Sequence, residues 1–525
     1  MTSLRNLTTP QRAPSSNRTA HARPTAFLVR GLMQLAMLPA VLFSAGCASS
    51  HATVSPAPRS PVAELRRAVD SMVSDPKFRT AQLGILVVDP ERGDTLYSHN
   101  AGKLFVPASN QKILTGATAL HLLGPGYRFV TTVAASGPVQ SGIVNGDLVV
   151  VGTGDPSVSD QMAGDGMAPL RTMADSLSAR GVRRVSGVLA AGGDAFPDAA
   201  LGFGWAWDDL DFAYSAGVDE LFFNEGFARV VVRGGGQAGT TPTVATAPAR
   251  TVPAVRLLAR TVAPGGTVRR GPQAVRVRQD SADASAIIVE GDIGAGDSVA
   301  LTIAHRDQRG AYLRALLEAL GEKGIVVDGG VSRELSAPTY PLFSVPSPPL
   351  AAILRAFEKP SQNQIGEILL KTLGRAKAGV GVADSGARVV RDQLLAWGAA
   401  PDGFVIRDGS GLSRHNVVTP ETIVRVLAAI RRDTAFASFQ DALPVAGVDG
   451  TIASRMRGTP AQGNVHAKTG TLDMVRSLSG YVTTADGRVL IFSVLSNNVT
   501  VPLREVERVQ DALAVRLAQL RLGDR

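Results

Sequence analysis

Strand and helix signals gather at the two ends of the chain, and a long stretch of different character separates them. The strand-like segments are 83–88 and 95–98 near the start, and 475–483 and 488–496 near the end. Asp486-Gly487, which lies between the last two segments, is a typical hairpin turn. Amphipathic helical patterns follow Ser60-Pro61 and cover residues 506–520.

The centre of the chain is richer in short strands and in turns that contain Gly and Pro. Its strand-like segments are 147–151, 228–232, 286–289 and 298–303, and helical runs near 168–180 and 311–323 interrupt them. An inserted β-rich region inside a split domain explains this order better than consecutive separate domains do. We therefore expect an α/β (α+β) fold in which an antiparallel sheet is flanked by helices and split by an insertion of one or two domains.

The first 46 residues contain five arginines and no Lys, Asp or Glu, and their apolar run over 31–43 is followed by Ser44-Ala45-Gly46-Cys47. A basic start, a short apolar run and small residues predict a secretory signal over 1–47. Cys47 is the only cysteine, and its place resembles that of the lipidated cysteine in a bacterial lipoprotein signal. The alternative is a plain signal peptide in which Cys47 is incidental. Residues 48–59 are small, polar and Pro-containing, which predicts a linker.

Charge and cysteine content disfavour several classes of partner. The formal charge of +9 falls to +4 when the five leader arginines are removed, and no basic run has interleaved aromatics, so nucleic acid is a poor candidate. The seven scattered histidines and the single cysteine predict no metal, no other cofactor and no intrachain disulfide. Gly234–Gly239 fits a GxGxxG pattern, but no helix follows it, so we expect a hairpin loop there rather than a nucleotide site.

The first candidate motif is Ser109-Asn110-Gln111-Lys112, which precedes a helical run over 113–122. A serine and a lysine three positions apart lie one helical turn apart on the same face. A serine hydroxyl needs a base to become a nucleophile, and a lysine can be that base only if burial or a nearby cation lowers its pKa. The spacing is common, however, since Ser74-Asp75-Pro76-Lys77 repeats it where a helix is ending.

The second candidate motif is Ser361-Gln362-Asn363, in a turn before a helical run over 365–373. A hydroxyl and an amide that face one cleft can relay a proton and bind a peptide group. The structural alternative is helix N-capping, which both Ser and Asn favour. The same S-x-N spacing recurs at Ser496-Asn497-Asn498, so the motif alone is weak.

The third candidate motif is Lys468-Thr469-Gly470-Thr471, in a strand-like run. An outer strand can pair with an extended peptide, Lys468 can bind a carboxylate, and Gly470 leaves room for close approach. The Thr471 N–H could serve an oxyanion together with that of Ser109. The alternative is a solvated lysine beside a strand.

S-x-x-K, S-x-N and K-T-G in this order form the signature set of penicillin-binding proteins and serine β-lactamases. From about residue 60 to the C-terminus the chain resembles a narrower family, the D-alanyl-D-alanine carboxypeptidase/endopeptidase group of class C low-molecular-mass penicillin-binding proteins. The segments that carry this resemblance are Gly154-Asp155-Pro156, 408–414 (DGSGLSR) and 443–451 (LPVAGVDGT). The separation of 252 positions between Ser109 and Ser361 also agrees, because that group has a large insertion between its first two motifs.

The resemblance implies an exported serine peptidase that cuts D-Ala-D-Ala bonds or D-alanyl cross-links in peptidoglycan and is inhibited by β-lactams. It implies that Ser109 is acylated, Lys112 is its base, Ser361 relays a proton and Asn363 holds the substrate amide. Lys468 and Thr469 would bind the substrate carboxylate. Asp209, Tyr214, Arg414 and Asp473 would form a side pocket for the diamino-acid end of the stem peptide. In the family an uncharged polar residue is expected in place of Asp473. The alternative for Arg414 is a structural ion pair.

The resemblance also implies domain limits: a penicillin-binding catalytic domain over 60–130 and 344–525, an inserted region over 131–343, and a nested β domain at 220–304. Two other functions remain open. One is a β-lactamase, which the long insertion disfavours. The other is a catalytically silent wall-binding lipoprotein, which the presence of Ser109, Lys112, Ser361 and Lys468 disfavours.

Overall fold

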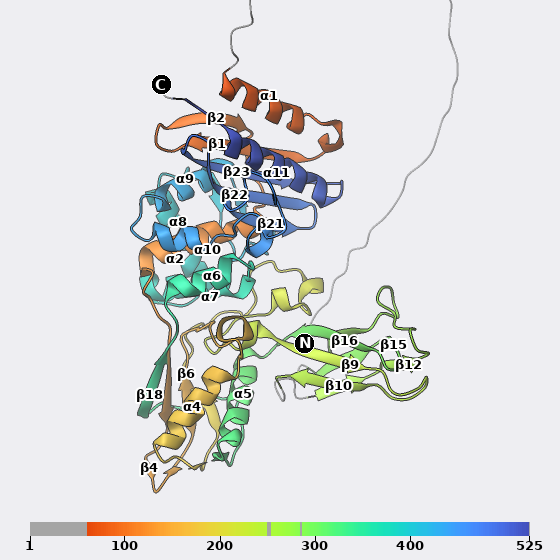
Figure 1. Cartoon of the computed structure of the whole chain (residues 1–525). Coiled ribbons are helices and arrows are strands. Elements are labelled where there is room, and N and C mark those ends of the chain that lie inside the picture. Colours follow the sequence, from red (N-terminus) through yellow and green to blue (C-terminus); the bar gives the residue numbers. More distant parts are fainter. Residues whose placement is uncertain (1–59, 249–253, 284–285, 524–525) are drawn as a thin grey trace, which may run out of the picture. The chain divides into compact units, whose positions relative to one another are not determined.

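The computed structural model describes residues 60–248, 254–283 and 286–523 (Figure 1). The expected signal peptide (1–47), with Cys47, and the expected linker (48–59) lie outside the described residues. Within the described ranges, no helix has both the length and the apolar character needed to cross a membrane.

Segments from both ends of the chain form one antiparallel sheet in the order β2-β1-β23-β22-β21. Figure 1 shows the orange strands of the N-terminal part beside the blue strands of the C-terminal part. The bounds are β1 (Gln82–Asp89), β2 (Asp94–His99), β21 (His466–Leu472), β22 (Val475–Thr483) and β23 (Val489–Asn497). The predicted hairpin is confirmed: β22 and β23 pair around Gly487, whose φ of +85° suits glycine.

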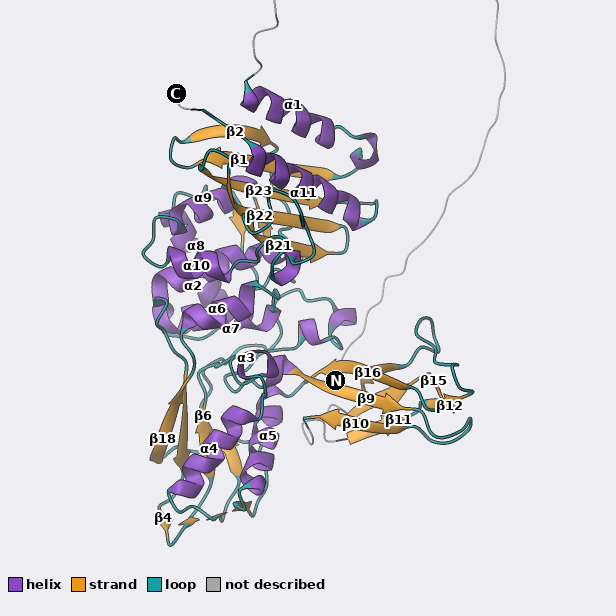
Figure 2. Cartoon of the chain, in the orientation of Figure 1, coloured by secondary structure: helices purple, strands orange, loops and turns teal. Residues whose placement is uncertain are grey.

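Helices cover both faces of this sheet (Figure 2). Side chains alternate along a strand, so Ile85 and Val87 of β1 pack on one face and Leu86 packs on the other. The first face is covered by α1 (Pro61–Val73) and α11 (Leu503–Gln519). The second face is covered by α2 (Gln111–Leu123), α6 (Leu350–Glu358), α7 (Asn363–Ala378), α8 (Ala383–Ala396), α9 (Pro420–Ile430) and α10 (Phe436–Ala442), while β19 (Phe404–Val405) and β20 (Val417–Val418) form a small separate pair.

The residues between α2 and α6 form two groups with separate apolar cores, and the first group builds two sheets. One sheet has the order β18-β3-β6-β8 and the other β17-β7-β5-β4. The core packs these strands against α4 and α5. The bounds are β3 (Val130–Ala135), β4 (Val139–Gln140), β5 (Ile143–Val144), β6 (Leu148–Val151), α3 (Asp160–Ala163), α4 (Ala168–Ala179), β7 (Arg184–Val185), β8 (Leu189–Ala191), α5 (Gln308–Glu322), β17 (Val326–Val327) and β18 (Tyr340–Pro346).

The second group of strands has a separate apolar core around Val230, Val232, Val289 and Ile303. The bounds are β9 (Phe227–Arg233), β10 (Thr243–Ala247), β11 (Ala254–Leu257), β12 (Arg260–Val262), β13 (Arg276–Gln279), β14 (Ala286–Glu290), β15 (Asp292–Gly294) and β16 (Ser298–Ala304). The glycine-rich loop 234–239 joins the antiparallel strands β9 and β10, so the expected hairpin loop is confirmed. The insertion is therefore rich in β structure, as the sequence predicted.

Candidate active site

Ser109 lies in a single 3₁₀ turn, Ala108–Asn110, that leads directly into α2. Ala108 has φ +49°, a left-handed conformation that residues other than glycine adopt at a cost and that is concentrated at functional sites. The turn leaves Ser109 partly exposed, one helical turn before Lys112. The Lys112 Nζ lies 3.0 Å from the Ser109 Oγ.

Lys112 is fully buried, and its Nζ contacts three oxygen atoms. Besides the Ser109 Oγ, Nζ contacts the Asn363 Oδ1 at 2.7 Å and the Ser410 backbone carbonyl at 2.6 Å. Burial, followed by repulsion from Lys468, lowers the pKa of Lys112 to about 7. The amine therefore loses its proton near neutral pH, and the neutral form can act as a base.

Ser361 also has a left-handed backbone, with φ +66°. The capping residue of α7 is Gln362, whose side-chain oxygen accepts from the Ile365 N–H at 2.8 Å, so the expected alternative of capping by Ser361 or Asn363 is wrong. The Ser361 Oγ instead accepts from the Lys468 Nζ at 2.8 Å. The Asn363 Nδ2 donates to the Tyr214 carbonyl at 2.8 Å.

Lys468 lies on β21, the outermost strand of the sheet, and its side chain is fully buried. The alternative of a solvated lysine is therefore wrong. Burial lowers the pKa of Lys468 to about 8. Nζ also donates to the Thr469 carbonyl at 3.1 Å, which holds the ammonium beside the K-T-G motif.

Gly470 is packed closely against the turn that carries Ser109. A Cβ atom at this position would stand 2.0 Å from the Ser477 Oγ, 2.6 Å from the Pro107 carbonyl oxygen and 3.0 Å from the Ser109 nitrogen. Only glycine fits without a shift of the neighbouring backbone. The K-T-G glycine thus brings β21 next to the Ser109 N–H.

The three motifs meet in one cleft of about 810 Å³. Its lining includes residues from each motif and from the expected side pocket, namely Ser109, Ser361, Asn363, Thr469, Thr471, Asp209, Tyr214, Arg414 and Asp473. Lys112 and Lys468 lie beneath the lining and reach the two serine oxygens. In contrast, Ser74 and Lys77 lie at the end of α1, where Lys77 pairs with Asp75 at 3.1 Å.

The side-pocket residues come from two segments. Tyr214 donates from Oη to the Asp209 Oδ1 at 2.5 Å, and Arg414 donates to the Asp473 backbone carbonyl at 3.0 Å. The expected alternative of a structural ion pair for Arg414 finds no support, because no carboxylate among the described residues lies within ion-pair distance of it. The guanidinium remains exposed at the cleft.

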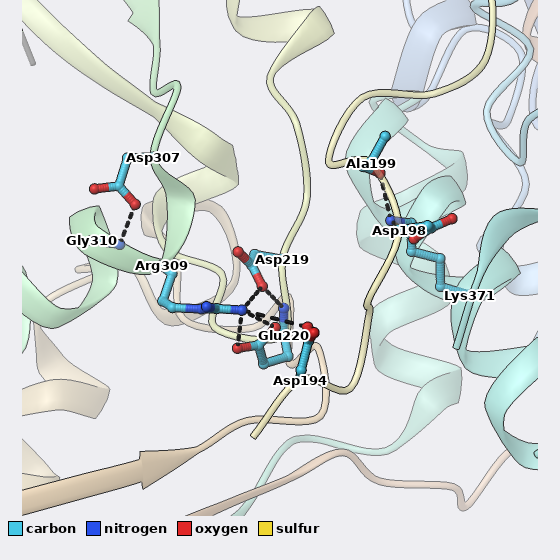
Figure 3. A network of polar contacts seen from close by, with 9 residues as sticks. All are labelled: Asp194, Asp198, Ala199, Asp219, Glu220, Asp307, Arg309, Gly310 and Lys371. Carbon is cyan, nitrogen blue, oxygen red and sulfur yellow. Dashed lines mark hydrogen bonds and ion pairs between the residues drawn. The ribbon is translucent and has the colours of Figure 1, made fainter. Parts of the chain in front are cut away.

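The segment that carries Asp209 and Tyr214 is bound at both ends (Figure 3). At one end, Lys371 of α7 donates to the Asp198 Oδ1 at 2.5 Å and to the Ala199 carbonyl at 2.8 Å. At the other end, the Arg309 guanidinium of α5 binds Asp219 and Glu220, and it also pairs with Asp194, which precedes the Lys371 contacts. These contacts hold the segment against both α7 and α5.

Sequence reasoning missed several groups that complete the cleft. The Ser410 carbonyl binds Lys112, the Asn110 amide donates to the Lys468 carbonyl at 2.8 Å, and the Thr451 hydroxyl lies 2.7 Å from that of Thr469. Asn110 and Thr451 stand inside segments that the sequence singled out, but their partners depend on the fold. Glu358 was also missed, although its spacing from Leu350, Ile353, Leu354 and Phe357 places it on the buried side of α6.

A helix-covered antiparallel sheet with two serine–lysine pairs in one cleft defines a serine-type acyl-transfer enzyme. The D-Ala-D-Ala carboxypeptidase 3 (S13) family matches residues 65–520. The chain belongs to this family and is a serine-type D-Ala-D-Ala carboxypeptidase, so the predicted family and type of enzyme are confirmed.

Individual relatives agree with this assignment. The D-alanyl-D-alanine carboxypeptidase of Actinomadura sp. (strain R39) is 35% identical over 519 residues, covering 96% of this chain and 93% of that protein. The D-alanyl-D-alanine carboxypeptidase DacB of Haemophilus influenzae is 26% identical, covering 78% and 84%. The crystal structure of penicillin binding protein 4 from Haemophilus influenzae matches with a TM-score of 0.75 and 23% identity, over 86% of this chain and 99% of that one, which confirms the fold class.

Proposed function

We propose that the chain cuts D-Ala-D-Ala ends, D-alanyl cross-links, or both in bacterial peptidoglycan through an acyl-enzyme at Ser109, and that β-lactams inhibit it by acylating the same oxygen. The observation that carries the proposal is the meeting of two serine–lysine pairs, Ser109 with Lys112 and Ser361 with Lys468, in one cleft. The matched Haemophilus influenzae structure is that of a penicillin-binding protein, which supports the β-lactam part.

The first step of this mechanism is the acylation of Ser109. In the neutral Lys112 amine, two N–H bonds point to the Asn363 Oδ1 and the Ser410 carbonyl, which leaves the lone pair for the Ser109 hydroxyl. As the Ser109 oxygen bonds to the carbonyl carbon of the penultimate D-Ala, its proton passes to Lys112. The N–H groups of Ser109 and Thr471 stabilise the negative charge that develops on the carbonyl oxygen.

The second step releases the last D-Ala. The C–N bond breaks as Ser361, held by Lys468, passes a proton to the leaving nitrogen, and the proton that Lys112 took from Ser109 replaces it, so that Lys112 is neutral again. Water then attacks the ester carbonyl, the C–O bond to Ser109 breaks, and the serine oxygen regains a proton. The shortened peptide leaves with a new terminal carboxylate.

In this proposal the substrate peptide lies along the outer strand β21. Lys468 and Thr469 bind its terminal carboxylate, Asn363 holds a substrate amide, and Gly470 allows close approach. The buried Lys468 ammonium is well suited to a carboxylate because a low-dielectric surrounding strengthens the attraction.

The same proposal assigns the side pocket to the diamino-acid end of the stem peptide. Asp209, Tyr214, Arg414 and Asp473 line the cleft next to Ser109. Carboxylates and one guanidinium together suit a side chain that carries both an ammonium and a carboxylate. Asp473 adds a negative charge to this pocket and makes it more favourable for ammonium groups.

We further propose the following organisation. Residues 60–130 and 344–525 form the catalytic domain, 131–343 form the inserted region, and 220–304 form a β domain nested within it; the separate apolar cores support this division. Residues 1–47 direct export to the cell envelope, lipid at Cys47 anchors the mature chain, and residues 48–59 form the tether. The mass of the native N-terminus tests the anchor, because a mature chain without lipid on Cys47 contradicts it.

Labelling with a fluorescent penicillin tests the nucleophile. Wild-type mature protein is expected to form a stable labelled adduct, and Ser109→Ala is expected to abolish it. Ser74→Ala is the matched control, because Ser74 has the same spacing to a lysine but lies at the end of α1. Labelling that survives Ser109→Ala would place the nucleophile elsewhere.

Two other outcomes of the same experiment favour the competing functions. Rapid turnover of the penicillin would indicate a β-lactamase, and the lack of any adduct would indicate a catalytically silent wall-binding lipoprotein. Release of D-Ala from a peptide that ends in D-Ala-D-Ala, measured beside the cleavage of cross-linked dimers, separates carboxypeptidase from endopeptidase activity.

A further inference from the structure

Glu358, the last residue of α6, is a buried carboxyl group that the mechanism above does not use. Its side chain has 0% exposure. Neither carboxyl oxygen has a hydrogen-bond partner among the described residues. Buried polar groups are almost always hydrogen-bonded, and an unpaired buried charge is costly, so this carboxyl group needs an explanation.

The charged groups that act on Glu358 are the two lysines of the cleft. Lys468 of β21 and Lys112 of α2 both attract its carboxylate electrostatically. The Lys112 Nζ also lies 5.8 Å from the ring centre of Phe357, the residue before Glu358. The end of α6 therefore lies close to Lys112 and within electrostatic range of Lys468.

Helix α2 makes room for this carboxyl group. Gly116 lies one turn after Lys112, and a Cβ atom there would stand 2.7 Å from the Glu358 Oε1. A methyl group at position 116 would force the carboxyl group out of its present place. Lys112 and Gly116, which leaves space for the carboxyl group, thus lie on the same face of α2.

Other acidic groups near the lysines are already bound. The Glu367 Oε1 of α7 accepts from the Gly409 and Ser410 N–H groups, at 3.0 Å each. Asp408 accepts from Trp205, Ser410, Gly411, Ser413 and Asn416. Both carboxyl groups hold the loop that presents the Ser410 carbonyl, whereas Glu358 has no such structural bond.

The remaining charged groups around α6 are paired elsewhere. Arg355 of α6 pairs with Asp441 of α10, Lys359 with Asp449 at 2.7 Å, and Asp160 of α3 with Arg229 at 3.3 Å. Glu358 is therefore the acidic group best placed to balance the two buried ammonium groups.

We propose that Glu358 is a positioning residue that acts through both lysines, holding a proton on Lys468 for carboxylate binding while Lys112 is neutral and accepts the proton of Ser109. The inference rests on the proposed function of the two lysines. A carboxylate behind the pair favours their charged forms, so it sets the pH range in which one lysine is neutral and the other is charged. Burial raises the pKa of Glu358 itself to about 7, so the three groups titrate in one range.

The test is the pH dependence of acylation in Glu358→Gln, which removes the charge and keeps the shape. Without the carboxylate both lysines lose their protons more readily. The rise of the acylation rate on the acid side and its fall on the alkaline side are therefore both expected to move to lower pH, by about one unit. The readout is the acylation rate with a fluorescent penicillin between pH 5 and 10, together with kcat/KM for a peptide ending in D-Ala-D-Ala. Glu358→Met, which is also uncharged, is expected to give the same shift.

Two further variants separate charge from packing. Gly116→Ala displaces the carboxyl group without changing its chemistry and favours the helix, so it is expected to shift the profile in the same direction as Glu358→Gln. Asp155→Asn is the matched control, because Asp155 is a buried carboxyl group in the insertion that does not act on either lysine. Its profile is expected to keep the limbs of the wild type.

If Glu358→Gln lowers the acylation rate at every pH but does not shift the acid and alkaline sides of the profile, the inference is overturned and Glu358 has only a packing role. The same result in Gly116→Ala would overturn it if the glutamine variant does not fold. These outcomes differ from a failure of the proposed function, in which the wild-type protein itself forms no adduct at Ser109.

Discussion

The side-chain amide of Asn110 donates a hydrogen bond of 2.8 Å to the backbone carbonyl of Lys468. It ties the turn that carries Ser109 to the strand that carries the second lysine. The Asn110 Oδ1 accepts from the Ser479 Oγ at 2.7 Å, so one fully buried amide joins the 3₁₀ turn before α2 to the two strands β21 and β22. The relative position of the two serine–lysine pairs depends on this bridge.

Asn110→Ala is therefore expected to reduce both stability and acylation. It removes a buried donor from the Lys468 carbonyl, which costs about 1–3 kcal/mol of the free energy of unfolding, while the Ser479 hydroxyl keeps its contact of 2.9 Å with the Ser493 hydroxyl. Urea unfolding and the rate of labelling by fluorescent penicillin measure the two effects.

Asn464→Ala is the matched control for this prediction. Its amide also bridges backbone groups, since it accepts from the Thr483 N–H at 2.8 Å and donates to the Thr483 carbonyl at 2.7 Å, but it lies before β21 and does not line the cleft. It is expected to lower stability while the labelling rate of the folded protein stays close to that of the wild type. Equal losses of labelling in both variants would show that Asn110 has no special role in the site.

The pH profile of the wild-type enzyme is expected to be bell-shaped. Below about pH 7 Lys112 gains a proton and can no longer accept one from Ser109, so acylation falls on the acid side. Above about pH 8 Lys468 loses the charge that binds the substrate carboxylate, so kcat/KM falls on the alkaline side.

Lys112→Arg tests the acid limb directly. A guanidinium stays protonated throughout the accessible range and cannot take the Ser109 proton, so acylation is expected to fall by about 10²–10⁴-fold at every pH. Lys77→Arg, in the second S-x-x-K segment, is expected to change nothing. Full activity of Lys112→Arg would exclude Lys112 as the base.

Gly470→Ala is expected to impair acylation without greatly reducing the amount of folded protein. The added methyl group would overlap the Ser477 Oγ at 2.0 Å and the Pro107 carbonyl at 2.6 Å, so β21 and the Ser109 turn have to move apart. A displacement of about 1 Å at a reacting centre can cost roughly 10²-fold in rate.

Gly102→Ala is the control for this substitution, since the nearest atoms to its new methyl group are 3.8 Å away, on the Glu421 carboxyl group. Labelling kinetics of both variants, with circular dichroism to confirm folding, provide the measurement. A Gly470→Ala enzyme with wild-type kinetics would show that the close approach of β21 to Ser109 is not needed.

The main strands and helices could be predicted because their signals are local. The Asp486-Gly487 turn and the strand-like segments on either side of it predicted β22 and β23 over nearly their observed bounds. Spacing alone also predicted that Lys112 would face Ser109, because both lie on one helix. The pairing of β1 with β23 follows only from the split order of the signals, since the paired residues are more than 400 positions apart in the sequence.

The groups that complete the site had no such signal. Ser410 acts through a backbone carbonyl, which every residue possesses, and its position depends on Glu367 and Asp408 holding its loop. Gln362, rather than Ser361 or Asn363, caps α7, although capping preferences favour Ser and Asn over Gln. Glu358 could have been found from the periodicity of α6, but a charged residue at the end of a helix is usually assigned to the surface.

Asp473→Asn is expected to change the preference of the proposed side pocket rather than the chemistry. Asp473 is exposed at the cleft, and its backbone carbonyl holds Arg414, so the substitution removes a negative charge and leaves the guanidinium in place. Peptides whose third side chain ends in a carboxylate should gain about two- to fivefold in kcat/KM relative to those that end in an ammonium group, because exposed charge pairs contribute only up to about 1 kcal/mol. Asp473→Glu keeps the charge and should keep the wild-type preference, and added salt should shrink the difference. If the ratio of the two kcat/KM values is unchanged in Asp473→Asn, the third side chain of the peptide lies outside this pocket. A charged side chain bound in the pocket would be affected by the loss of a carboxylate from the same cleft.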